Sequence, residues 1–206
     1  MKTRPTIKSI EIFEFEHEMN DVGAEPTIGI PIYKPGGKGT RRTGAIKIHT
    51  DSGTVGEYVG GGATEYAAIP GLAPTLIGRG ALNREDIYND VKQATRQQAR
   101  MGQGVLDMAL WDLAGKYYDA PIYELLGGTK KKLPCYASTY VGDHEADGLG
   151  SPEAYADFAE HCLELGYPGF KIHGWQDAPI DQQIALVHAV GRRVGGKMDL
   201  MLDPFC

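Results

Sequence analysis

The chain has 206 residues, of which 42% are apolar, and its formal net charge is −6. Length and composition allow one or two folded domains. The densest basic run is Lys130–Lys132, so the sequence lacks the basic face that nucleic-acid binding needs. No stretch approaches the roughly 18 apolar residues of a membrane-spanning helix, and the N-terminus lacks the apolar segment of a signal peptide. We expect a cytoplasmic protein that binds neither nucleic acid nor membrane.

The cysteines do not form a recognisable framework. Cys135, Cys162 and Cys206 are widely spaced and odd in number, and no CxxC or Cys/His ligand spacing occurs. Disulfide scaffolds and structural zinc sites depend on such spacings. We therefore expect reduced thiols that pack as small apolar side chains.

The first half of the chain is predicted to contain a small antiparallel sheet followed by helices. Apolar and charged residues alternate at the start, a Gly- and Pro-rich segment follows, and a turn at Asp51–Gly53 indicates a hairpin. Apolar residues then recur at helical spacing. The predicted elements are a strand over 7–16, a mobile loop over 17–42, a hairpin over 44–61, and helices over 83–99 and 104–118.

The second half alternates between strand and helix patterns. Ser151 and Pro152 form a helix start, with a capping side chain and a proline at the first helical position. The predicted elements are a strand over 133–141, a helix over 152–165, a strand over 169–175, a helix over 179–195 and a strand over 199–206. Successive strands separated by single helices are typical of a parallel α/β barrel.

The barrel prediction conflicts with the amount of sequence. A complete (β/α)₈ barrel needs about 250 residues, and the residues from Leu133 onward are far fewer and supply three strands. A three-stranded parallel layer would leave a long edge exposed. We therefore expect a fragment of a longer protein, or a barrel whose remainder is contributed elsewhere.

Three residues at predicted strand ends suggest a catalytic site. Lys171 and His173 lie on the second strand of this half and Asp203 on the third, and barrel enzymes place functional groups at the carboxyl ends of strands. Alternation predicts Lys171, His173 and Trp175 on one face. Apolar surroundings and a second cation would lower the pKa of the lysine, as a base for an α-proton requires. The alternatives are an exposed Lys-x-His pair, and an aspartate that merely caps a turn.

Residues 101–128, MGQGVLDMALWDLAGKYYDAPIYELLGG, carry a family resemblance. This segment closely resembles a signature of the mandelate racemase and muconate lactonizing enzymes, within the enolase superfamily. The resemblance implies an α+β capping domain over 1–128 and a modified (β/α)₇β barrel beginning at 129, of which three strands are present, with an essential Mg²⁺. Asp112 in the signature helix is expected to be structural.

The resemblance also assigns roles. Lys171 and His173 match a Lys-x-Lys motif whose second lysine is the usual base, so His173 is the expected base and Lys171 would hold the substrate carboxylate, although the two roles are exchangeable. Asp203 matches the first of three carboxylate metal ligands, and Phe205 replaces an asparagine that is common in the family. The remaining ligands are expected beyond Cys206. Tyr33, Tyr140 and Trp175 are candidate substrate contacts, and the segments 17–42 and 60–62 resemble loops that close over substrate.

The implied function is Mg²⁺-dependent abstraction of the α-proton of a small carboxylate through an enediolate. An acid-sugar dehydratase is the leading interpretation, with a racemase, epimerase or cycloisomerase as the alternative. A homo-oligomer is expected, and the fragment alone is expected to be inactive. Two other classes stay open: a Schiff-base aldolase acting through Lys171, and a catalytically incomplete module.

Overall fold

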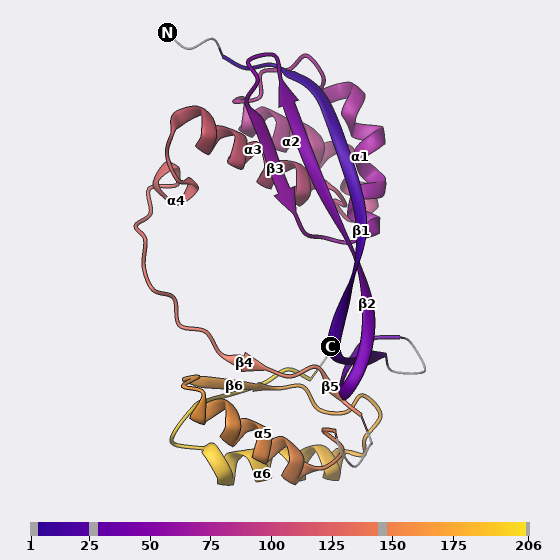
Figure 1. Ribbon diagram of the computed structural model, residues 1–206, viewed down its shortest axis with the longest axis vertical. Helices are drawn as coiled ribbons and strands as arrows, with labels where there is room; N and C mark the ends of the chain where they lie inside the picture. Colours follow the sequence, from indigo (N-terminus) through magenta and orange to yellow (C-terminus); the bar gives the residue numbers. More distant parts are fainter. Residues whose placement is uncertain (1–3, 25–28, 144–147, 205–206) are drawn as a thin grey trace. The chain divides into compact units, whose positions relative to one another are not determined.

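The computed structural model describes residues 4–24, 29–143 and 148–204, which belong to two compact units (Figure 1). The first unit comprises Met1–His17 and Arg41–Lys131, and the second comprises Glu18–Thr40 and Lys132–Cys206. One unit boundary therefore lies close to the predicted division after residue 128, whereas the grouping of 18–40 with the second unit was not predicted. Within the described ranges, no helix has the length and apolar character needed to cross a bilayer.

The sheet of the first unit is built from β1 (Ile7–Ala24), β2 (Pro31–Thr50) and β3 (Val55–Val59), in the order β1-β2-β3. The predicted hairpin is confirmed, because β2 and β3 pair antiparallel with Ile48 opposite Gly56. Gly56 is required for packing, since a Cβ there would collide with the carbonyl oxygen of Ala109.

The loop predicted over 17–42 is wrong. β1 continues to Ala24 and β2 begins at Pro31, with residues 25–28 outside the described ranges. Ion pairs join the two strands, Glu18 to Lys38 and Glu16 to Arg42, each at 2.8 Å. The Gly and Pro content suggested a loop. The segment is instead a mostly exposed two-stranded ribbon, whose side chains need not be apolar, so the alternating apolar pattern of a strand is missing.

Four α-helices and one short 3₁₀ helix complete the first unit: α1 (Ala63–Leu76), α2 (Arg84–Ala94), η1 (Arg96–Gln98), α3 (Gln103–Tyr118) and α4 (Ile122–Leu125). The predictions over 83–99 and 104–118 correspond to α2 with η1 and to α3. Helix α1 was not predicted. It contains Pro70 and Pro74, and interior prolines normally argue against a helix because they remove a backbone hydrogen bond.

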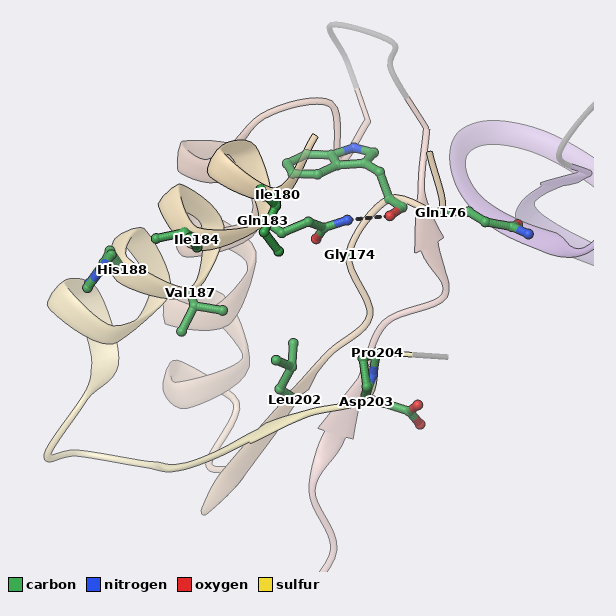
Figure 2. Close-up of a pocket in the computed structure, with 11 residues that line it drawn as sticks. Gly174, Gln176, Ile180, Gln183, Ile184, Val187, His188, Leu202, Asp203 and Pro204 are labelled. Atoms are coloured by element: carbon green, nitrogen blue, oxygen red, sulfur yellow. Dashed lines mark hydrogen bonds between the residues drawn. The ribbon is translucent and has the colours of Figure 1, made fainter. Parts of the chain in front are cut away.

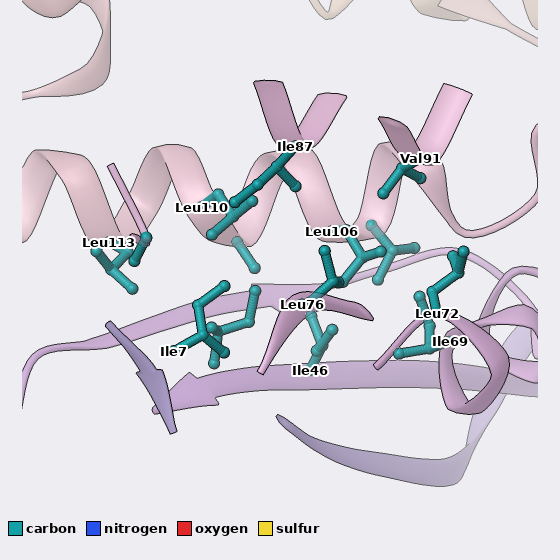
Figure 3. Close-up of a cluster of buried hydrophobic side chains, with 14 of the residues drawn as sticks. Ile7, Ile46, Ile69, Leu72, Leu76, Ile87, Val91, Leu106, Leu110 and Leu113 are labelled. Carbon is teal, nitrogen blue, oxygen red and sulfur yellow. The ribbon is translucent and has the colours of Figure 1, made fainter. Parts of the chain in front are cut away.

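The core of the first unit lies between the sheet and helices α1, α2 and α3 (Figure 3). Ile46 and Ile48 contribute from β2, and Leu106, Leu110 and Leu113 contribute from α3. Each of these five side chains is at most 1% exposed. Burial of this apolar surface, and not helix propensity, accounts for most of the stability of such short helices.

Leu110→Ala is expected to lower the free energy of unfolding by about 2–5 kcal/mol, because it leaves a cavity in a close-packed core. Met108→Ala on the same helix is the matched control, since Met108 is 50% exposed, and its effect should stay within about 0.5 kcal/mol. Urea denaturation of both variants measures the difference. Equal effects would contradict this description of the core.

Helix α3 is also fixed to β3 by polar contacts. Asp112 Oδ2 accepts hydrogen bonds from the backbone N–H of Glu57 at 2.8 Å and from Lys116 Nζ at 2.7 Å. Lys116 Nζ also donates to Glu57 Oε2 at 2.7 Å, and this contact is the largest cause of the lowered pKa of Glu57. The structural role expected for Asp112 is confirmed by these contacts.

The second unit contains β4 (Ala137–Ser138), β5 (Val141–Gly142), α5 (Pro152–Glu164), β6 (Gly169–Ile172), α6 (Ile180–Val194) and β7 (Asp199–Leu202). Strands β4, β6 and β7 form a parallel sheet in that order, while β5 pairs with β2 through Ile32 and Tyr33. Helices α5 and α6 lie side by side on one face of the parallel sheet (Figure 1). The alternation of strands and helices is confirmed.

Local details of the second unit agree only in part with prediction. The N-cap is confirmed, since Ser151 Oγ accepts a hydrogen bond from the backbone N–H of Ala154 at 3.1 Å. The strand predicted over 133–141 is wrong in extent, because only the two residues of β4 pair with β6. Leu133 is 80% exposed; a segment rich in strand-forming residues stays irregular where no neighbouring strand pairs with it.

Candidate functional site

The structure brings Lys171, His173 and Asp203 together. Lys171 lies on β6, His173 follows the end of β6, and Asp203 follows the end of β7. The strands pair in parallel, with Ile172 opposite Leu202, and the last bond runs from Asp203 N–H to the carbonyl oxygen of Ile172 at 2.9 Å. Parallel strands present their carboxyl ends at one edge, so the side chains that follow these ends can meet there.

One carboxylate oxygen lies within contact distance of both other side chains. Asp203 Oδ2 lies 2.9 Å from His173 Nε2 and 3.2 Å from Lys171 Nζ. The side chains of His173 and Lys171 are 13% and 21% exposed, whereas that of Asp203 is 40% exposed. The cluster is therefore partly open to solvent, which leaves room for a ligand on the exposed side of the aspartate.

The imidazole of His173 is oriented by the strand beside it. Nδ1 lies 2.6 Å from the carbonyl oxygen of Thr139. A carbonyl oxygen can only accept, so Nδ1 carries a hydrogen and donates it. Nε2 is consequently the ring atom at which a proton can be taken up or released. Nε2 faces Asp203 Oδ2, so the reactive nitrogen lies next to the carboxylate.

The lowered pKa predicted for Lys171 is wrong. The structure raises the pKa of Lys171, chiefly because Asp203 accepts a hydrogen bond from it, while burial acts in the opposite direction. The Nζ atom also lies 5.4 Å from the centre of the Tyr136 ring. The prediction assumed apolar neighbours, whereas the lysine has a counter-charge beside it, so it stays cationic at neutral pH.

The donor set agrees only in part with a Mg²⁺ site. Mg²⁺ prefers oxygen ligands and commonly uses one or two carboxylates together with water, and Asp203 is a carboxylate at the expected strand end. Across the described residues, however, no group of three or more His, Cys, Asp or Glu side chains is placed to hold a metal. Phe205, which replaces the family's asparagine, lies outside the described residues. Asp203 can thus serve as one ligand of an incomplete set.

The three predicted substrate contacts have different surroundings. Tyr33, in β2, packs against Phe158 of α5 with ring centres 5.5 Å apart. Tyr140 is 37% exposed just before β5. The shared face predicted for Trp175 is wrong: β6 ends at Ile172, and the Trp175 ring is 2% exposed in the core. Its Nε1 donates to the carbonyl oxygens of Asp143 and Leu149.

A hollow of about 520 Å³ lies between α6 and the end of β7 (Figure 2). Leu202 and Val187 point into it, whereas the carboxylate of Asp203 points away from α6. Lys171 and His173 do not line it. The hollow is therefore a mostly apolar space on the helix side of the sheet, and Asp203 lines both this hollow and the Lys171–His173–Asp203 cluster.

Sequence reasoning missed several neighbours of the cluster. Thr139 contacts His173 with both its hydroxyl and its carbonyl oxygen, and the hydroxyl of Tyr155 donates to the carbonyl oxygen of His173 at 2.6 Å. Tyr136 lies beside Lys171. The parallel pairing of β4 with β6 would have indicated Tyr136 and Thr139, but no sequence pattern places Tyr155, on α5, under His173.

Comparison with known proteins identifies the family. The model for the "Mandelate racemase / muconate lactonizing enzyme, N-terminal domain" matches residues 35–127. The chain is 31% identical to D-galactonate dehydratase of Variovorax paradoxus and 29% identical to D-galactarolactone cycloisomerase of Agrobacterium fabrum, over 77% of its own length in each case. It spans 44% and 43% of the length of these two relatives.

A solved structure shows the same similarity. The crystal structure of D-glucarate dehydratase from Agrobacterium tumefaciens, complexed with magnesium, superposes with a TM-score of 0.85 at 28% identity. The superposition covers 98% of this chain and 54% of that one. The signature helix, the fold and the relatives agree, and the chain belongs to the mandelate racemase and muconate lactonizing enzyme family of the enolase superfamily, matching its N-terminal part.

Proposed function

We propose that this chain is part of a Mg²⁺-dependent enzyme that removes the α-proton of an acid sugar and dehydrates it. The observation that carries the proposal is the meeting of His173 Nε2 and Lys171 Nζ at one oxygen of Asp203. Abstraction of an α-proton from a carboxylate substrate requires a base and positive charge beside the substrate. His173 offers the base, Lys171 offers a cation, and the carboxylate of Asp203 lies within hydrogen-bond distance of both. In this proposal residues 1–128 are the capping domain and the residues from 129 onward begin a modified (β/α)₇β barrel.

His173 is the proposed base. Its Nδ1–H is held by the carbonyl oxygen of Thr139, which leaves Nε2 to accept the substrate proton. An imidazole suits this role because its unperturbed pKa lies close to neutral pH. Lys171 is proposed to hold the substrate carboxylate, since its ammonium group stays charged and points toward the same place.

Asp203 is the proposed metal ligand from this part of the protein. When bound, Mg²⁺ supplies positive charge that stabilises the enediolate as negative charge develops on the substrate carboxylate. Binding a metal would engage the carboxylate of Asp203, whose Oδ2 now faces both His173 and Lys171. Nε2 of His173 would then be released toward the substrate.

The reaction step balances as follows. Nε2 of His173 takes the α-proton, and the electron pair of the broken C–H bond moves into the carboxylate to form the enediolate. The enediolate electron pair then forms a double bond between the α- and β-carbons, while the bond from the β-carbon to its hydroxyl oxygen breaks. The oxygen keeps the electron pair of that bond and leaves as water with a proton from a general acid. The enol that remains tautomerises to an α-keto acid. The relatives named as D-galactonate and D-glucarate dehydratases support this substrate class.

A second candidate shares the first step. The relative named as a D-galactarolactone cycloisomerase favours an isomerase, either a cycloisomerase or a racemase, in which the enediolate is protonated without loss of water. Product analysis distinguishes the two: an α-keto acid formed from D-galactonate or D-glucarate supports dehydration, whereas an isomer of unchanged mass supports the alternative.

Lys171→Met in the complete protein should lower kcat/KM about 10- to 100-fold, because a hydrogen bond to a charged group is worth about 1.5–3 kcal/mol. Lys197→Met, an exposed lysine in the same unit, is the control and should change it little. Borohydride added with substrate should trap no adduct. A covalent adduct on Lys171 in metal-free protein would contradict the proposal and support a Schiff-base aldolase.

A further inference from the structure

We propose that Thr139 and Tyr155 are positioning residues that hold His173 so that only its Nε2 is presented for proton transfer. The inference rests on the proposed role of His173 as the base. It names two residues that neither the family signature nor the strand-end pattern indicates, one in the segment after β4 and one on α5.

His173 needs such support because it lies beyond its own strand. β6 ends at Ile172, and the last pair between β4 and β6 joins Ser138 to Lys171. The N–H and C=O of His173 therefore have no place in the regular strand ladder. Polar backbone groups in a partly buried position need partners, or they cost free energy.

Side chains supply those partners. The N–H of His173 donates to Thr139 Oγ1 at 3.2 Å, and the carbonyl oxygen of His173 accepts from the Tyr155 hydroxyl at 2.6 Å. The ring Nδ1 donates to the carbonyl oxygen of Thr139 at 2.6 Å. Three groups of one residue are thus held by two neighbours, and Nε2 remains as the ring atom that faces Asp203.

Both neighbours are buried and make contacts of their own. Thr139 is 6% exposed, and its own N–H donates to the carbonyl oxygen of Lys171 at 3.4 Å. Tyr155 is fully buried, with its ring edge-on to Trp175 at 5.2 Å between ring centres. Burial raises the pKa of Tyr155, so the hydroxyl keeps its hydrogen and donates it at every working pH.

The test compares four variants of the complete protein. Thr139→Val keeps the shape of the side chain but cannot accept the hydrogen bond, whereas Thr139→Ser keeps the hydroxyl. Tyr155→Phe removes the donor to the carbonyl oxygen of His173. Thr95→Val is the matched control, because the hydroxyl of the buried Thr95 in the first unit donates to the carbonyl oxygen of Val91 at 2.7 Å.

Thr139→Val and Tyr155→Phe should each lower kcat roughly 10- to 100-fold, as expected for a small displacement of a catalytic group. KM should change less than threefold, and Thr139→Ser and Thr95→Val should stay within about threefold of the wild type in both constants. Wild-type kcat in Thr139→Val or Tyr155→Phe would overturn the proposal. The proposal would also be overturned if the loss of kcat were fully explained by a smaller fraction of folded protein, which the unfolding temperature reports.

A second readout does not depend on activity. In protein labelled with ¹⁵N-histidine, the hydrogen on Nδ1 of His173 should give a downfield signal protected from exchange with water, assigned by its absence in His173→Asn. In Thr139→Val the carbonyl acceptor of Nδ1 remains, but the backbone N–H of His173 loses its acceptor, so the signal should exchange faster with water; in Thr139→Ser it should persist. If His173 is not the base, His173→Asn keeps full turnover, while the protected Nδ1 signal of the wild-type protein still shows that the ring is held. Failure of the proposed function and failure of this inference are thus distinguishable.

Discussion

Asp203→Asn in the complete protein is expected to weaken Mg²⁺ binding at least about 10- to 100-fold, since even indirect partners of a metal ligand are worth that much. The change removes a ligand charge and keeps the shape of the side chain. It also takes away the one carboxylate that contacts both Lys171 and His173 in the described site. Turnover should fall with metal binding.

Calorimetric titration of the metal-free protein with Mg²⁺ measures this effect. Asp199→Asn is the matched control, because Asp199 is an exposed aspartate at the opposite end of the same strand, β7. The control should bind Mg²⁺ as the wild type does. Unchanged affinity in Asp203→Asn would remove Asp203 from the metal site.

His173→Asn is expected to lower kcat about 10²- to 10⁴-fold, the usual contribution of a general base. Asparagine can still donate toward the carbonyl oxygen of Thr139 but offers no basic nitrogen where Nε2 stands. Mg²⁺ affinity should stay within about twofold, because His173 contacts the proposed ligand without being one.

The matched control for that variant is His161→Asn, since His161 lies exposed on α5, where its Nδ1 is 3.9 Å from Glu164 Oε2. Steady-state turnover of D-galactonate and D-glucarate measures both variants. Wild-type turnover in His173→Asn would assign the base to another residue. Loss of turnover in both variants would point to a general defect in the second unit.

The sequence predicted the proximity of Lys171, His173 and Asp203 better than it predicted the chain around them. Lys171 lies near the carboxyl end of β6, His173 and Asp203 directly follow β6 and β7, and parallel pairing brings those ends together. Trp175 was misplaced because alternation was extended past Ile172, where the strand ends. A period-2 pattern holds only as long as the backbone stays extended.

The errors in the first unit have a different origin. Helix α1 contains two prolines and the long ribbon of β1 and β2 is rich in glycine, so local preferences argued against both elements. Packing of Tyr66, Ile69 and Leu76 into the core stabilises α1 in spite of its prolines. Tertiary contacts outweigh local propensity in such cases, and they cannot be read from one sequence.

The charge state of Lys171 is a further property that depends on tertiary contacts and could not be predicted from the sequence. The sequence places a lysine on a strand but does not show that a carboxylate lies 3.2 Å from it. That contact changes the direction of the pKa shift. It also favours His173 over Lys171 as the proposed base, a choice that the residues alone left open.

The most direct test of the proposed chemistry measures cleavage of the α-C–H bond. The complete protein is incubated with D-galactonate or D-glucarate deuterated at the α-carbon, with Mg²⁺ or with a chelator, and loss of deuterium to water is followed by NMR. The proposal predicts that deuterium is lost with Mg²⁺ present and retained after chelation. Turnover that leaves the α-deuterium in place, or deuterium loss that continues without metal, would contradict it.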